Sequence, residues 1–82
     1  MAANKHYIYI VKCKDGTLYT GYTTDIKRRL KEHNSGKGAK YTRGRCPVKL
    51  KYQEVFDSRS QAQKREYQIK KLPRKKKEEL FC

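Results

Sequence analysis

The sequence has no long apolar run, few cysteines and few acidic residues. Nothing in it approaches the 18 consecutive apolar residues of a membrane-spanning helix, and residues 1–7, MAANKHY, carry no apolar secretion segment. The three cysteines are odd in number, widely spaced and without a CxxC arrangement, so they predict neither a disulfide framework nor a zinc site: Cys13, Cys46 and Cys82. We therefore expect a reduced, cytoplasmic protein with no membrane partner.

The shortage of acidic residues leaves the chain strongly basic. Its 82 residues contain 22 Lys and Arg against 8 Asp and Glu, which gives a net charge of +14. Repulsion among like charges opposes compaction, so a folded domain that keeps them is expected to bind a polyanion, most often nucleic acid. A solvated basic surface and a disordered basic tail are the alternatives, but 11% aromatic content and regular apolar spacing favour one packed domain.

Two segments near the N-terminus predict a β-hairpin. Residues 6–13, HYIYIVKC, and 17–23, TLYTGYT, are rich in β-branched and aromatic residues, and KDG between them favours a turn. A two-residue turn would place Tyr9 and Tyr19 on opposite faces of the sheet. A three-residue loop with a G1 bulge at Gly16 would make them diagonal neighbours on one face. The sequence leaves both registers open, although KDG suits the bulged form.

The segment after the hairpin predicts a helix. Thr24 or Asp25 is a suitable N-cap for IKRRLKEHN, and SGKG ends the run. Residues at spacings of four and three form its inward stripe: Ile26, Leu30 and His33. Arg29 lies at the edge of that stripe, where a guanidinium can reach into a cleft.

A loop and a third strand follow. Residues 35–47, SGKGAKYTRGRCP, are interpreted as a mobile loop rich in glycine and basic residues. A strand is expected at about 48–56, VKLKYQEVF, where Val48, Leu50 and Tyr52 alternate with polar residues. One face of this strand should therefore be wet.

The last long helix carries a carboxylate on its apolar side. Asp57 or Ser58 is its N-cap, and Glu66 occupies one position of the inward stripe. The other positions of the stripe are apolar: Ala62, Ile69 and Leu72. A carboxylate on a buried face is costly unless it is paired or holds a metal ion. The helix should end at Pro73, because the residue before a proline disfavours the α region.

These residues resemble the GIY-YIG nuclease superfamily, particularly its small stand-alone bacterial members. YIY stands where the family has GIY, and YTG stands where it has YIG, with nine residues between Tyr9 and Tyr19. The match continues in chain order with the family's catalytic arginine, helix histidine and metal-binding glutamate: Arg29, His33 and Glu66. Tyr7 and Thr20 replace the family's first glycine and the YIG isoleucine, and GAKYTRGRCP is similar to a segment of the junction-cutting nucleases.

The resemblance implies an α+β fold, with a three-stranded antiparallel sheet whose hairpin strand is central and which is flanked by helices. It implies one domain over residues 1–82, with a core at about 6–73 and a basic turn or helix at 74–82.

The resemblance also implies metal-dependent cleavage of a phosphodiester bond. Tyr9 would accept a proton from the attacking water, and Arg29 would stabilise the charge that develops on the phosphate. Glu66 would hold one Mg²⁺ or Mn²⁺ ion. Tyr19 and His33 would orient Tyr9 or the water.

The other expected contacts are with nucleic acid, DNA rather than RNA. Gly21 suits a close approach of phosphate to the backbone. The loop and the C-terminal segment supply the residues expected to grip the phosphate backbone: Lys37, Lys40, Tyr41, Arg43, Arg45, Arg74, Lys75, Lys76 and Lys77. Cleavage is expected to be weakly specific or structure-specific, and both a protein partner that supplies specificity and a homodimer that cuts two strands fit the sequence.

Two other functions stay open. The same surface fits a DNA-binding or RNA-binding module whose nuclease site is idle. Tyr41 among basic residues also fits stacking on an unpaired base of a structured RNA.

Overall fold

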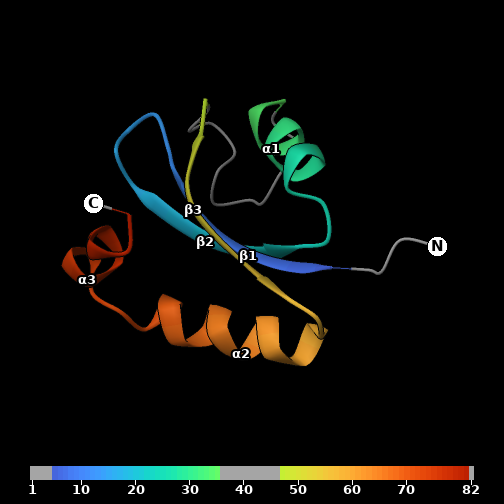
Figure 1. Cartoon of the computed structure of the whole chain (residues 1–82). Helices are drawn as coiled ribbons and strands as arrows, with labels where there is room; N and C mark the ends of the chain where they lie inside the picture. Colours follow the sequence, from blue (N-terminus) through green and yellow to red (C-terminus); the bar gives the residue numbers. More distant parts are fainter. Residues whose placement is uncertain (1–4, 36–46, 82) are drawn as a thin grey trace.

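A three-stranded antiparallel sheet separates α1 from α2 and α3 (Figure 1). This computed structural model describes residues 5–35 and 47–81. The strands are ordered β2-β1-β3 in the sheet and have these bounds: β1 (His6–Lys12), β2 (Leu18–Thr23) and β3 (Lys49–Phe56). The helices have these bounds: α1 (Ile26–Asn34), α2 (Arg59–Lys70) and α3 (Arg74–Glu79). The predicted fold class, with a central hairpin strand, is confirmed.

The hairpin adopts the bulged register. Gly16 has a φ of +88°, the left-handed conformation that a G1 bulge requires. The backbone N–H of Cys13 donates to the carbonyl of Thr17 at 2.8 Å, so these two residues close the ladder across a three-residue loop. Val11 consequently lies opposite Tyr19. The tyrosines of the two triplets therefore share one face of the sheet.

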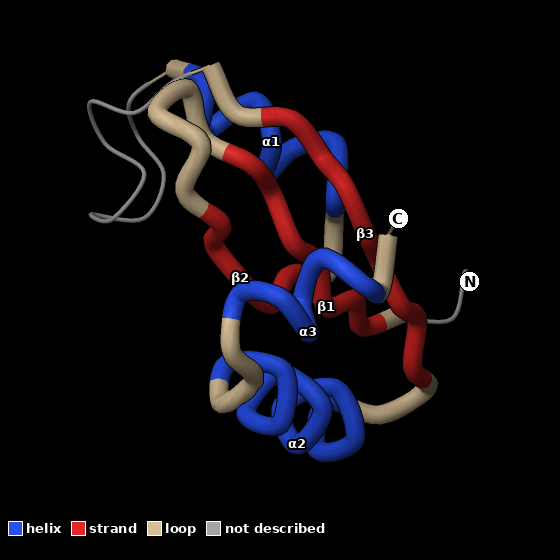
Figure 2. The backbone as a smooth tube through the Cα atoms, turned by 90° about the vertical axis from the view of Figure 1, so that its left-hand side faces the viewer, coloured by secondary structure: helices blue, strands red, loops and turns tan. Residues whose placement is uncertain are grey.

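The central strand β1 is buried on both faces, and its alternating side chains divide the core in two. Ile8 and Ile10 face α2 and pack against Ala62 and Ile69. On the other face, towards α1, the second cluster contains these residues: Tyr9, Val11, Cys13 and Val48, with Tyr19, Ile26, Leu30 and Leu50 packed against them. Figure 2 shows the strands between α1 and α2 from the side. Because period-two alternation sends successive residues to opposite faces, one short strand supplies both cores.

A β-bulge interrupts the pairing of β3 with β1. Val11 lies opposite Leu50, but Ile10 lies opposite Tyr52, so Lys51 is an extra residue on β3. Exposed and half-buried residues still alternate along β3, as predicted. The prediction that Leu50 and Tyr52 share one face is wrong, because the extra residue moves Leu50 to the α1 side and Tyr52 to the α2 side.

Side-chain caps fix where α1 and α2 begin. Asp25 caps α1 by accepting from the N–H of Arg28, and Ser58 caps α2 in the same way. Residues 36–46 of the predicted loop at 35–47 lie outside the part of the chain that the structure describes. Among the residues that the structure describes, no helix has the length and apolar character needed to cross a membrane.

Candidate active site

Tyr9 lies across the neighbouring strand β2, over Gly21. The two residues are partners in the β1–β2 register, and Tyr9 is only 1% exposed. A Cβ atom at Gly21 would lie 2.6 Å from Cζ of Tyr9 and 3.0 Å from Cε2 of Tyr19. Ordinary carbon contacts are about 3.5–4.0 Å, so any side chain at this position would displace the ring. The structure therefore gives Gly21 a role in making room for Tyr9, beside its predicted role in phosphate contact.

The Tyr9 hydroxyl forms a hydrogen bond with His33 of α1. The distance between Oη of Tyr9 and Nε2 of His33 is 3.0 Å, and His33 is fully buried. Tyr19 packs against both rings, with centroid distances of 6.4 Å to Tyr9 and 5.6 Å to His33. These contacts among the three rings restrain the position of the Tyr9 hydroxyl.

Burial changes the protonation behaviour of both members of this pair. It raises the pKa of Tyr9 to about 12, and the negative charge of Glu66 acts in the same direction, while Arg29 opposes them. Burial also lowers the pKa of His33, and the positive charge of Arg29 adds to that effect. Near neutral pH, Tyr9 is therefore a neutral hydroxyl and His33 a neutral imidazole.

Arg29 of α1 lies close enough to Tyr9 to interact with its hydroxyl. Its Nη1 also donates to Oε1 of Glu32 at 3.0 Å, and its side chain is 27% exposed. Burial lowers the pKa of Arg29, but the contacts with Tyr9 and Glu32 outweigh it and raise the pKa. Glu32 was missed in the sequence, although its position three residues after an arginine on one helix is a signal for such a pair.

Glu66 is half-buried, at the edge of the inner face of α2. Its side chain is 19% exposed, and Oε2 accepts from Nζ of Lys70 at 3.1 Å. The expected carboxylate on the buried side therefore has a partner, Lys70, which was not predicted from the sequence. Its charge acts on Tyr9, so residues from β1, α1 and α2 meet electrostatically at one hydroxyl.

Comparison with known proteins shows the family of this chain. The sequence pattern of the GIY-YIG catalytic domain matches residues 5–79. The chain belongs to the GIY-YIG family. A UPF0213 protein of Halobacterium salinarum is 62% identical, covering 93% of this chain and 99% of that protein. One from Staphylococcus saprophyticus is 64% identical over 95% of both chains.

A relative whose structure has been solved shows the same fold. The solution NMR structure of a UPF0213 protein from Bacillus halodurans has 58% sequence identity and a TM-score of 0.60, and the match covers 93% of this chain and 81% of that one. The resemblance noted in the tyrosine triplets is thus confirmed at the level of the family, which places the chain in the nuclease superfamily.

GIY-YIG nucleases typically use a divalent metal ion, and one carboxylate here fits that chemistry. Within residues 5–35 and 47–81, no three metal-binding side chains cluster. Mg²⁺ usually keeps several waters and binds through one or two carboxylates together with substrate phosphates, so it needs no such cluster. Glu66 is a partly exposed carboxylate near Tyr9, as this mode of binding requires.

The predicted nucleic-acid contacts of the GIY-YIG domain are only partly visible. Five of them lie outside the described residues: Lys37, Lys40, Tyr41, Arg43 and Arg45. On α3, Arg74 pairs with Glu78 and Lys76 with Glu79, which neutralises part of the basic tail. Arg74 and Lys77 line a hollow of about 180 Å³ at the start of β2. Lys75 is exposed.

Proposed function

We propose that this chain is a metal-dependent endonuclease that hydrolyses DNA phosphodiester bonds with weak or structure-dependent specificity. One observation carries the proposal. The Tyr9 hydroxyl is hydrogen-bonded to a buried neutral histidine and lies within electrostatic reach of both Arg29 and Glu66. The +14 charge favours a phosphate-rich substrate.

The hydrogen bond between Tyr9 and His33 offers a way around the high pKa of the tyrosine. With a pKa of about 12, Tyr9 is not ionised near neutral pH and cannot act as a free tyrosinate. It can instead donate its proton to Nε2 of His33 while it takes a proton from the attacking water. The resulting hydroxide attacks phosphorus, and the departing oxygen takes a proton from solvent. General-base catalysis of this kind typically contributes about 10²–10⁴-fold.

Arg29 supports the same step through charge. As phosphorus becomes five-coordinate, negative charge builds on its oxygens, and a fixed guanidinium stabilises this charge more than it stabilises the starting ester. Glu32 accepts from Nη1 of Arg29, which orients the guanidinium, and the five N–H donors of arginine leave some for a phosphate. Lysine would not replace this planar fork.

Glu66 is the residue that would hold the metal ion, Mg²⁺ or Mn²⁺. When bound, such an ion supplies a Lewis acid that offsets the charge on the phosphate oxygens. Nζ of Lys70 lies 3.1 Å from Oε2 of Glu66, so this ion pair must break before Glu66 can bind a metal ion.

Substitution of Glu66 by glutamine tests the proposal. Supercoiled plasmid and branched DNA are incubated with Mg²⁺ or Mn²⁺, and binding to the same DNA is measured in parallel. Glu66→Gln should abolish nicking while binding stays intact or becomes tighter. Glu79→Gln, which removes an exposed carboxylate of α3, is the matched control and should nick normally. A wild-type protein that binds DNA but never nicks it would make the chain a binding module and refute the endonuclease.

A further inference from the structure

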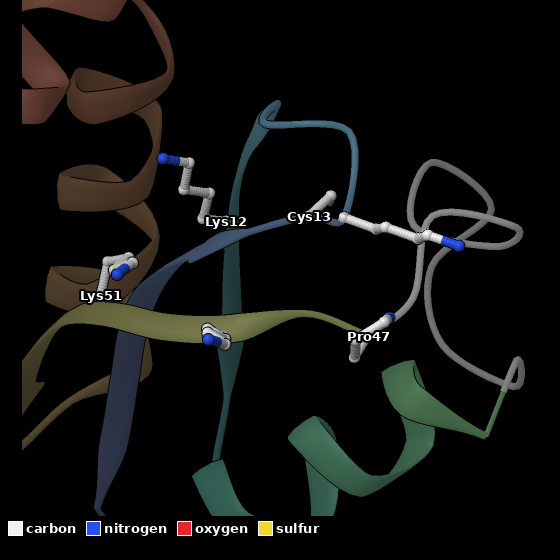
Figure 3. Close-up of a pocket in the computed structure, with 6 residues that line it drawn as sticks. Lys12, Cys13, Pro47 and Lys51 are labelled. Carbon is white, nitrogen blue, oxygen red and sulfur yellow. The ribbon is translucent and has the colours of Figure 1, made fainter.

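A basic pocket lies where the hairpin meets the first residues of β3, apart from the tyrosine site. Its volume is about 280 Å³, and these residues line it: Lys12, Cys13, Lys14, Pro47, Lys49 and Lys51. Figure 3 shows it at the end of β1, with Lys12 and Lys51 projecting from neighbouring strands. Four of the six lining residues are lysines. None of these lysines was among the nucleic-acid contacts predicted from the sequence.

The sheet itself brings these charges together. Lys12 of β1 is the register partner of Lys49 on β3, and like charges directly opposite one another destabilise a strand pair. The β-bulge adds Lys51 to the same pocket, and bulges commonly redirect a side chain near a functional site. A fold that places three lysines together in this way gains stability when an anion neutralises them.

No carboxylate of the described residues forms an ion pair with a pocket lysine. Six of the eight acidic residues form ion pairs elsewhere: Glu32, Glu54, Asp57, Glu66, Glu78 and Glu79. The other two hold local structure, because Asp25 caps α1 and Asp15 accepts from Thr17 in the hairpin loop. The four pocket lysines form no ion pair with any described residue, so their donors are available to a ligand.

We propose that this lysine pocket binds a backbone phosphate of the nucleic-acid substrate, other than the phosphate that is cleaved. The proposal rests on the proposed function, because the ligand is that enzyme's substrate. Lys12 lies three positions after Tyr9 on β1, a rise of about 10 Å at roughly 3.3 Å per residue, and strand alternation places Lys12 on the face of Ile8 and Ile10, opposite to the face of Tyr9. The pocket would add affinity for the substrate without taking part in the chemistry.

Salt-dependent DNA binding tests the pocket, and it is measured in EDTA so that no cleavage occurs. The variant Lys12→Gln/Lys49→Gln removes two pocket charges. The control Lys31→Gln/Lys64→Gln removes two exposed lysines of α1 and α2 that do not line the pocket. The pocket holds one phosphate, and each lost phosphate contact lowers the slope of log K against log salt by about 0.9, so the pocket variant should lose about 0.9 and bind roughly 8-fold more weakly at 0.1 M salt. The control should keep the wild-type slope. Equal losses in the two variants would overturn the proposal.

The melting temperature of the pocket variant shows whether it has lost its fold. Removing the repulsion between Lys12 and Lys49 should leave the melting temperature of the free protein unchanged or higher. A pocket variant that melts well below the wild type would contradict the predicted repulsion.

The source of the phosphate is tested by NMR. Amide shifts of Lys12, Lys14, Lys49 and Lys51 should move when a short duplex is added and stay in place with inorganic phosphate at equal ionic strength. Equal shifts with inorganic phosphate would overturn the assignment to a nucleic-acid backbone. Because these measurements need no catalysis, a protein that binds without nicking would refute the endonuclease while leaving the pocket supported.

Discussion

Replacing Gly21 with alanine should disturb the candidate active site, although it adds only one methyl group. The new Cβ would lie 2.6 Å from Cζ of Tyr9, about 1 Å inside an ordinary carbon contact. Tyr9 is 1% exposed and bordered by Tyr19 and His33, so its ring cannot move aside without breaking its hydrogen bond to His33. Overpacking of this kind costs about 1–3 kcal/mol, which is about 5–20 °C in the melting temperature of a domain this small.

The effect on catalysis should exceed the effect on stability. A displacement of about 1 Å at a reacting group can cost roughly 100-fold in rate. We therefore expect Gly21→Ala to nick supercoiled plasmid about 100-fold more slowly at a temperature where circular dichroism shows it folded.

The hairpin supplies a matched control in Gly16→Ala. Gly16 has a positive φ and nothing within 4 Å of an added Cβ, so alanine there costs about 1–2 kcal/mol of backbone strain without touching the site. This variant should melt at a lower temperature and still nick at the wild-type rate while folded. Wild-type melting and nicking in Gly21→Ala would refute the close packing of Tyr9 over β2.

Three further predictions concern single groups. The pKa of His33 is lowered in the folded chain, so below pH 6.5 the unfolded chain binds more protons and the free energy of unfolding decreases as the pH decreases. Urea titrations from pH 7 to 5 should show this decrease, and the same decrease in His33→Gln would count against the role of His33. The hydroxyl of Thr20 is buried with no hydrogen-bond partner in the described structure, so Thr20→Val should raise the melting temperature, with about 1 kcal/mol gained, and a lower melting temperature would show that the hydroxyl is satisfied. Lys70→Gln should free Glu66 and lower the half-saturating Mg²⁺ concentration about twofold, whereas Lys71→Gln should not, and equal values for both variants would contradict competition between Lys70 and the metal.

Local signals in the sequence predicted the elements well. Three signals depend only on residues close together in the chain: the strand segments around KDG, the cap before IKRRLKEHN and the proline after α2. Glu66 was placed on the inner side of α2 by spacing alone, and the structure finds its side chain 19% exposed. The partners Glu32 and Lys70 follow the same helical spacing and could have been predicted with it.

Other features depend on pairing across the sheet, which a single sequence does not specify. The bulge at Lys51 interrupts a regular alternation of KLKYQ and has no glycine to mark it. The need for glycine at residue 21 appears only when Tyr9 is placed opposite it. The Lys12–Lys49 opposition likewise requires the register of strands that are 37 residues apart (49 − 12).

The role of Tyr9 is tested most directly by the nicking rate of Tyr9→Phe on supercoiled plasmid with Mg²⁺. Phenylalanine keeps the ring over Gly21 and removes only the hydroxyl that contacts His33. Tyr67→Phe, at an exposed tyrosine of α2, is the matched control. We predict that the wild type and Tyr67→Phe nick the plasmid, whereas Tyr9→Phe is folded and at least about 100-fold slower. A folded Tyr9→Phe that nicks at the wild-type rate would contradict the proposed proton transfer through Tyr9 and His33.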